Sequence, residues 1–192
     1  SMSIKRNEVN PRFVRNIISE YNGMICDENF QRDYVWSDKE KRDFIKSVFS
    51  NQAASSIILA DIDSCLDATK SVGDQYSAAA LKKQKRKEKR YSKIDGHQRT
   101  STVYSFVKDQ FSITGTFTDN DEKEHLVENK FFSDLPNRLQ DKFLDTQLIV
   151  TTLYSYTYKE MVEVFKNIQK GSPLSQAEIR WAALTPYNDW VK

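Results

Sequence analysis

The segment YSKIDGHQRTST at residues 91–102 constrains the fold more than any other part of the sequence. It predicts a short strand that ends in a tight turn at Asp95-Gly96 and passes directly into a helix. The first N–H groups of such a helix have no partner within it, and the helix dipole favours negative charge there. With Arg99 as a fork-shaped donor and Asp95 as a metal or water ligand, this turn is a candidate phosphate site. The alternative is a plain strand–helix turn with a hydrogen-bonded Asp95, and so short a motif leaves both interpretations open.

The other patterns predict short strands among several helices. Apolar residues at helical spacing predict a first helix after Pro11 and another from Thr100 to Phe111. The apolar runs at 57–62 and 148–153 predict mostly buried strands. Three capping boxes each open a helical pattern: Ser37-x-x-Glu40, Thr157-x-x-Glu160 and Ser175-x-x-Glu178. We therefore predict an α+β fold, a small mixed sheet surrounded by helices, with C-terminal helices from about residue 157.

Positive charge is concentrated in one segment. The stretch KKQKRKEKR carries a net charge of +6 in a chain of net charge +2, and it closes an insertion at about 64–90 between two predicted strands. One interpretation is a solvated helix or a mobile loop. The other is a basic arm that attracts DNA through phosphate charge without reading its sequence. In that case the DNA-binding residues are Lys82, Lys83, Lys85, Arg86, Lys87, Lys89 and Arg90.

Composition sets broad limits. A chain of 192 residues with 39% hydrophobic and 29% charged residues suits a single globular domain. Cys26 and Cys65 lie in unrelated contexts, which indicates neither a disulfide framework nor a zinc site. The sequence has no apolar run near 18 residues and no signal-peptide pattern, so we expect a cytoplasmic protein without membrane contact. The ends of the sequence suggest the N-terminal part of a longer protein.

Five segments stand in an order that characterises one family. They are FQRDYVW (30–36), SSIILADI (55–62), IDGHQRTSTVYSFVKDQF (94–111), LPNRLQDKFLDTQLIV (135–150) and VFKNIQKGSPLSQAEIR (164–180). Together they resemble the N-terminal domain of GmrSD-type restriction endonucleases, whose hallmarks are Q-R-x-Y-x-W, D-G-Q-Q-R and F-x-x-x-N segments. The resemblance implies a ParB/sulfiredoxin-like fold and a role in restriction and antiviral defence.

The resemblance also implies nucleotide binding with hydrolysis at the turn after residue 94. Gly96 would let the backbone approach a phosphate, and Arg99 would neutralise charge on the transferred group. Gln98 would orient an attacking water, and Asp95 would hold Mg²⁺ beside a nucleoside triphosphate. His97 stands where the family usually has Gln, so it would serve as a phosphate donor or proton shuttle, or mark hydrolysis lost with binding retained.

Further residues are assigned to the same nucleotide site. Arg32 would clamp a phosphate while Tyr34 or Trp36 packs beneath it or beneath a base, although Trp36 also fits a core position. Thr100 follows the turn directly, and Gln169 stands where relatives usually carry Asn. His125 lies in the acidic stretch DNDEKEH, which predicts a solvent-exposed loop.

Several enzyme classes are excluded by their missing motifs, and three functions stay open. The sequence has no Walker-type P-loop, G-x-S-x-G elbow, HExxH or His-rich nuclease segment, so a DNA-cutting module would lie beyond this chain or on a partner. The first function is an NTP-hydrolysing domain that controls a defence nuclease. The second is a ParB-like DNA-binding module, and the third is a regulatory interaction domain without turnover.

Overall fold

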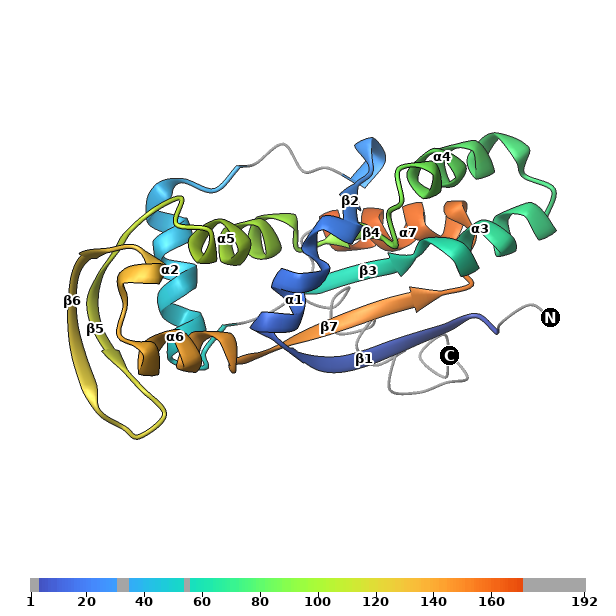
Figure 1. Cartoon of the computed structure of the whole chain (residues 1–192). Coiled ribbons are helices and arrows are strands. Elements are labelled where there is room, and N and C mark those ends of the chain that lie inside the picture. The colour runs from blue at the N-terminus through green and yellow to red at the C-terminus, as the bar shows by residue number, and fades with distance from the viewer. Residues whose placement is uncertain (1–3, 31–34, 54–55, 171–192) are drawn as a thin grey trace.

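A five-stranded mixed sheet forms the centre of the molecule in the computed structural model, which describes residues 4–30, 35–53 and 56–170 (Figure 1). Its strand order is β1-β7-β3-β4-β2, with β2–β4 and β3–β7 parallel and the other pairs antiparallel. The strands are β1 (Arg6–Phe13), β2 (Met24–Cys26), β3 (Ile57–Asp61), β4 (Tyr91–Asp95) and β7 (Gln147–Tyr154). A separate hairpin pairs β5 (Ile113–Thr118) with β6 (Glu124–Lys130).

Helices surround this sheet, which confirms the predicted α+β class. The α-helices are α1 (Val14–Glu20), α2 (Asp38–Phe49), α3 (Ile62–Ser71), α4 (Gln75–Arg86), α5 (His97–Val107), α6 (Asn137–Leu144) and α7 (Tyr158–Gln169). Three single 3₁₀ turns join them, η1 (Tyr21–Gly23), η2 (Glu28–Phe30) and η3 (Phe132–Asp134). The β5–β6 hairpin and the α3–α4 pair lie at opposite ends of the molecule (Figure 1).

Each face of the sheet supports its own hydrophobic core. In β3, Ile57 and Leu59 join one cluster while Ile58 and Ala60 join the other, as the two-residue period of a strand requires. The first cluster contains apolar residues of α1, α2, α5 and α6, and the second contains those of α3, α4 and α7. The sheet is therefore covered by helices on both faces, and α5 and α7 contact opposite sides of it.

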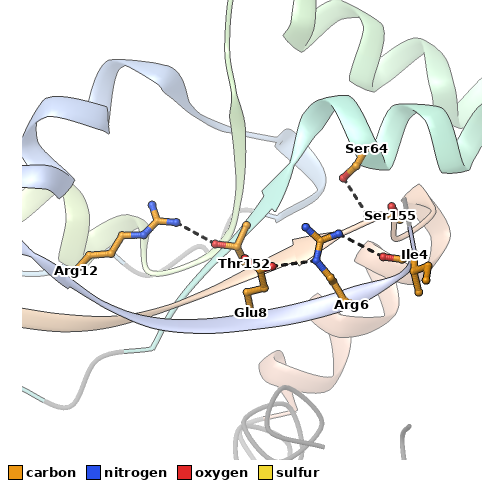
Figure 2. Close-up of polar contacts among 7 residues, drawn as sticks. All are labelled: Ile4, Arg6, Glu8, Arg12, Ser64, Thr152 and Ser155. Atoms are coloured by element: carbon orange, nitrogen blue, oxygen red, sulfur yellow. Dashed lines mark hydrogen bonds and ion pairs between the residues drawn. The ribbon is translucent and has the colours of Figure 1, made fainter. Parts of the chain in front are cut away.

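Charged side chains line the edge strand β1. Arg6 Nε donates to Glu8 Oε1 at 2.9 Å within the strand, and Arg12 reaches across to Thr152 Oγ1 of β7 at 3.2 Å (Figure 2). Just past the C-terminal end of β7, the backbone N–H of Ser155 donates to the hydroxyl of Ser64 in α3 (Figure 2). Charges along an exposed edge discourage pairing with a further strand.

Most of the predicted elements in the described residues are confirmed, with two differences. The capping boxes at Ser37 and Thr157 are both formed, whereas that at Ser175 lies outside the described residues. The predicted first helix begins only at Val14, because residues 6–13, Pro11 included, pair with β7 as strand β1. The insertion is a helical hairpin of α3 and α4, whose Leu66, Ala78 and Leu81 are buried against the sheet. No helix in the described part of the chain is long and apolar enough to span a membrane.

Candidate functional site

A pocket of about 530 Å³ opens where β4 ends and α5 begins. Five of the predicted residues line it, and they follow one another along the turn: Asp95, Gly96, His97, Gln98 and Arg99. Phe30, Val35, Trp36 and Lys41 also line it. The predicted strand–turn–helix therefore forms a concave site of the size that small-molecule ligands occupy.

Gly96 has a conformation that only glycine adopts without strain. Its φ is +93°, and a Cβ at this position would lie 2.8 Å from the carbonyl oxygen of Ser56 and 2.9 Å from Cα of Ile57. The chain therefore needs glycine here to let β3 and the turn approach each other. Gly96 is also the N-cap of α5 and offers no capping side chain, and among the described residues no side chain caps the first N–H groups of that helix.

Asp95 and Arg99 are held by the same residue, Ser56, which precedes β3. The Ser56 hydroxyl donates to Asp95 Oδ2 at 2.7 Å, and the Ser56 carbonyl accepts from Arg99 Nη1 at 3.2 Å. The Arg99 guanidinium carbon also lies 6.0 Å from the centre of the Trp36 ring. One serine thus positions both the Asp95 carboxylate and the Arg99 guanidinium, and Asp95 and Arg99 both line the pocket.

His97 is paired with a buried lysine. Nζ of Lys93, in β4, lies 3.0 Å from Nδ1 of His97. An ammonium group has only donors, so Nδ1 accepts and a neutral His97 carries its proton on Nε2. Burial, and after it the nearby Lys93 charge, lowers the pKa of His97, which favours the neutral ring. His97 therefore has one N–H to offer a ligand.

Gln98 connects α5 to the aromatic wall. Its side-chain oxygen accepts from the backbone N–H of Trp36 at 3.2 Å, which leaves the amide N–H groups as its donors toward the pocket. Trp36 is half-buried, packs against the first core cluster and lies 5.3 Å from the Phe44 ring. Trp36 thus packs against the core and also lines the pocket, and its contact with a phosphate or a base stays a prediction.

The structure does not bring every predicted residue into the pocket. The Thr100 hydroxyl is buried and donates to the backbone carbonyls of Gly96 and His97, inside its own helix. Gln169 is exposed at the end of α7 and is not among the described lining residues. Arg32 and Tyr34 lie outside the described residues.

His125 was expected in an exposed loop, and that expectation is wrong. The residue belongs to β6, and its side chain is only 15% exposed because Nε2 donates to Asp119 at 2.8 Å. The basic segment, in contrast, lies on the surface. It forms the end of α4 and the turn that follows, with Lys83, Lys85, Arg86, Lys87 and Arg90 exposed and Lys82 and Lys89 half-buried.

Sequence reasoning missed several polar residues of the site, among them Ser56, Lys93 and Lys41. The signal for Lys93 was its place in the middle of a strand whose other residues suit burial, because lysine is rarely buried. The roles of Ser56 and Lys41 depend on which segments are neighbours in space, and no local pattern announces that.

The donor set of the pocket suits only a metal ion that the ligand helps to hold. Asp95 is the one carboxylate among the described lining residues, and no group of three or more His, Cys, Asp or Glu residues gathers anywhere in the described chain. Mg²⁺ commonly takes one or two carboxylates together with phosphate oxygens and water. The residues present therefore fit a magnesium ion that arrives with a phosphate ligand.

Comparison with known proteins identifies the family of this chain. The family described as "GmrSD restriction endonuclease, N-terminal domain" matches residues 14–185, which include the whole described pocket. The chain belongs to this family, and so to a class of domains associated with restriction endonucleases. No curated protein and no solved structure matches the chain.

Proposed function

We propose that this domain binds a nucleoside triphosphate in the pocket at the start of α5 and hydrolyses it, thereby controlling a DNA nuclease activity carried elsewhere. The observation that carries the proposal is the uncapped N-terminus of α5, which meets Arg99 and Lys93 in one pocket. Backbone N–H groups, a guanidinium and an ammonium are the donors that recognise phosphate in proteins. The family membership supports the link to a nuclease.

Each pocket residue has a role that its contacts permit. Arg99 binds phosphate oxygens from the position that Ser56 gives it, and Gln98 donates through its amide while Trp36 holds its oxygen. His97 donates from Nε2. Trp36 and Phe30 supply apolar surface for a base or ribose. Asp95 would hold Mg²⁺, which when bound neutralises charge on the phosphates.

A thermal-shift series tests binding. The wild type is melted with GTP, UTP, CTP, ATP and their hydrolysis-resistant analogues, with and without Mg²⁺, because a ligand that binds only the folded state raises the melting temperature. Arg99→Ala should weaken, by about 10- to 100-fold, the affinity for the nucleotide that raises the wild-type melting temperature. Arg15→Ala is the matched control, since Arg15 forms an exposed ion pair with Asp145 and does not line the pocket. If Arg99→Ala and Arg15→Ala shift alike, the site is elsewhere.

Hydrolysis is tested separately, by phosphate release from the nucleotide that binds. His97→Gln introduces the amide that the family usually carries and isolates the effect of this position. Turnover in neither protein, with binding intact in both, would leave a nucleotide-binding domain that does not hydrolyse its ligand.

A second function, DNA binding, is favoured by the exposed basic end of α4. Among the described residues, Lys85 pairs with Asp63 and Lys89 donates to the Asn22 carbonyl, while Lys83, Arg86 and Lys87 form no ion pair. Changing these three residues to Gln leaves the buried Leu81 and Gln84 in place. If DNA binds here, the slope of log affinity against log salt falls by about 0.9 for each phosphate contact removed. An unchanged slope would exclude this surface.

A further inference from the structure

Lys93 is the least expected residue of the sheet. It lies in the middle of β4, and only 4% of it is exposed. A buried ammonium group loses its hydration, so proteins seldom bury lysine unless a carboxylate or another anion compensates for that loss. A residue so placed requires a partner.

Lys93 forms no ion pair with a residue that the structure describes, and the one carboxylate among the described pocket residues, Asp95, accepts from the Ser56 hydroxyl. Its Nζ lies 3.0 Å from Nδ1 of His97 and 4.6 Å from the centre of the Tyr21 ring. Cys26 is its neighbour across the β2–β4 pair, and burial raises the pKa of that thiol, which keeps it neutral near pH 7. None of the ion pairs formed by the described residues includes Lys93. In accord with this, burial lowers the pKa of Lys93.

The missing anion has a place to bind, because Lys93 lines the same pocket as Arg99 and the start of α5. We propose that Lys93 is a phosphate-binding residue whose charge is compensated when the phosphate group of the ligand occupies the pocket. The His97 ring, which accepts from Lys93 through Nδ1, positions the ammonium and adds its own Nε2–H as a second donor. This inference rests on the proposed function in that the natural phosphate compound is taken to be a nucleotide.

If Lys93 has this role, replacing it should raise the stability of the free protein and lower its affinity for phosphate compounds. Lys93→Met keeps the length of the side chain and its contact with Tyr21 but removes the buried charge. The free protein should therefore melt at a higher temperature than wild type, because an uncompensated buried charge is lost. Binding of phosphate compounds should weaken by about 10- to 100-fold, because a charged hydrogen-bond donor is lost. A lysine with a purely structural role would lower stability and leave affinity unchanged.

The chain offers a matched control in Lys108. Its Nζ lies 5.5 Å from the Tyr104 ring, and Tyr104 stacks on Tyr21 with ring centres 4.1 Å apart. The two lysines thus contact one tyrosine pair, but Lys108 is exposed and does not line the pocket. Lys108→Met should not raise the melting temperature of the free protein. It should also leave the affinity for phosphate compounds unchanged.

The experiment measures dissociation constants of a nucleoside triphosphate, inorganic tripolyphosphate and the bare nucleoside for wild type, Lys93→Met and Lys108→Met. Protection of Cys26 from a thiol reagent gives a second readout, since Cys26 lines the pocket while Cys65 is fully buried. We expect Lys93→Met to lose affinity for both phosphate compounds and to bind the nucleoside as wild type does. Lys93→Gln replaces it if the Met variant does not fold.

The arms separate failure of this inference from failure of the proposed function. Equal affinity of Lys93→Met and wild type for the triphosphate overturns the role of Lys93 and leaves nucleotide binding intact. If wild type binds tripolyphosphate but no nucleotide, and Lys93→Met loses it, the anion site stands and the nucleotide proposal fails. If wild type binds neither compound, both fail.

Discussion

The side-chain amide of Gln84 donates a 2.7 Å hydrogen bond to Oδ2 of Asp27, and both residues are buried. Gln84 belongs to the basic helix α4, whereas Asp27 follows Cys26, which lines the pocket. The hydroxyl of Tyr158, in α7, donates to the same oxygen at 2.9 Å. One carboxylate therefore joins the α3–α4 hairpin and α7 to the rim of the candidate site.

Asp27→Ala should be among the most destabilising single changes in the protein. It leaves the Gln84 amide, the Tyr158 hydroxyl and the backbone N–H of Asn29 without their acceptor. We expect a loss of about 3 kcal/mol in the free energy of unfolding, measured by urea titration. Asp67→Ala, at an exposed position of α3, should stay within about 0.5 kcal/mol of wild type. Similar losses in the two variants would show that the buried network contributes little.

Gly96→Ala and Gly73→Ala separate a steric clash from backbone strain. Both glycines have positive φ, +93° and +75°, but a Cβ at Gly73 would meet nothing within 4 Å. Gly73→Ala should cost about 1 kcal/mol. Gly96→Ala should cost about 3 kcal/mol or more, because β3 must also move. Urea unfolding of both variants measures the difference. Equal losses in the free energy of unfolding would mean that the backbone at Ser56 moves away from the new methyl group without cost.

The two cysteines should differ in alkylation by iodoacetamide. Cys65 is fully buried, and burial raises its pKa to about 12, so it should react only when the protein unfolds. Cys26 is partly exposed, but burial raises the pKa of its thiol above the ordinary 9.0. Its thiolate therefore forms at higher pH than that of a free cysteine, and its alkylation rate should still rise with pH where the free thiol has levelled off. Mass spectrometry of peptides across a pH series checks both expectations.

Asp119 should make the β5–β6 hairpin sensitive to acid. The hydrogen bond from His125, and after it the backbone N–H of Lys123, holds the pKa of the Asp119 carboxyl below its ordinary 3.8. A lowered carboxyl pKa stabilises the fold above 3.8, and this contribution is lost as pH falls through the lower folded-state value. Asp119→Asn should thus unfold more readily than wild type near pH 6, and this difference should shrink as pH falls below 3.8. Glu124→Gln, at an exposed position of β6, controls for charge alone. Parallel pH curves for Asp119→Asn and wild type would contradict this assignment.

The elements that the sequence predicts are those with local signals. The Ser37 and Thr157 capping boxes, the Asp95-Gly96 turn and the apolar runs of β3 and β7 are all read within a few neighbouring residues. Strand β1 has no such signal. Its sequence RNEVNPRF is polar and contains Pro11, which an edge strand accepts because one side of it makes no ladder hydrogen bonds.

The candidate site was predictable to the same extent. The residues contiguous in the turn lie together because the chain itself joins them, and Asp95 through Arg99 are found in one pocket. Ser56 and Lys41 join them through sheet register and helix packing, which a local pattern does not contain. Thr100 shows the converse, since it is adjacent in sequence but turns its hydroxyl into its own helix.

The close contact between Gly96 and Ser56 has a consequence for how such sites change over evolutionary time. The glycine is demanded by the meeting of two backbone segments, whether or not a ligand ever enters the pocket. In a related protein that no longer binds the ligand, selection for stability would still keep Gly96. Lys93 would then be a buried charge without compensation, and its replacement by an apolar residue would be favoured. In related sequences, the residue two positions before the Asp-Gly pair should therefore distinguish sites that bind the ligand from sites that do not, and it should do so better than the glycine does.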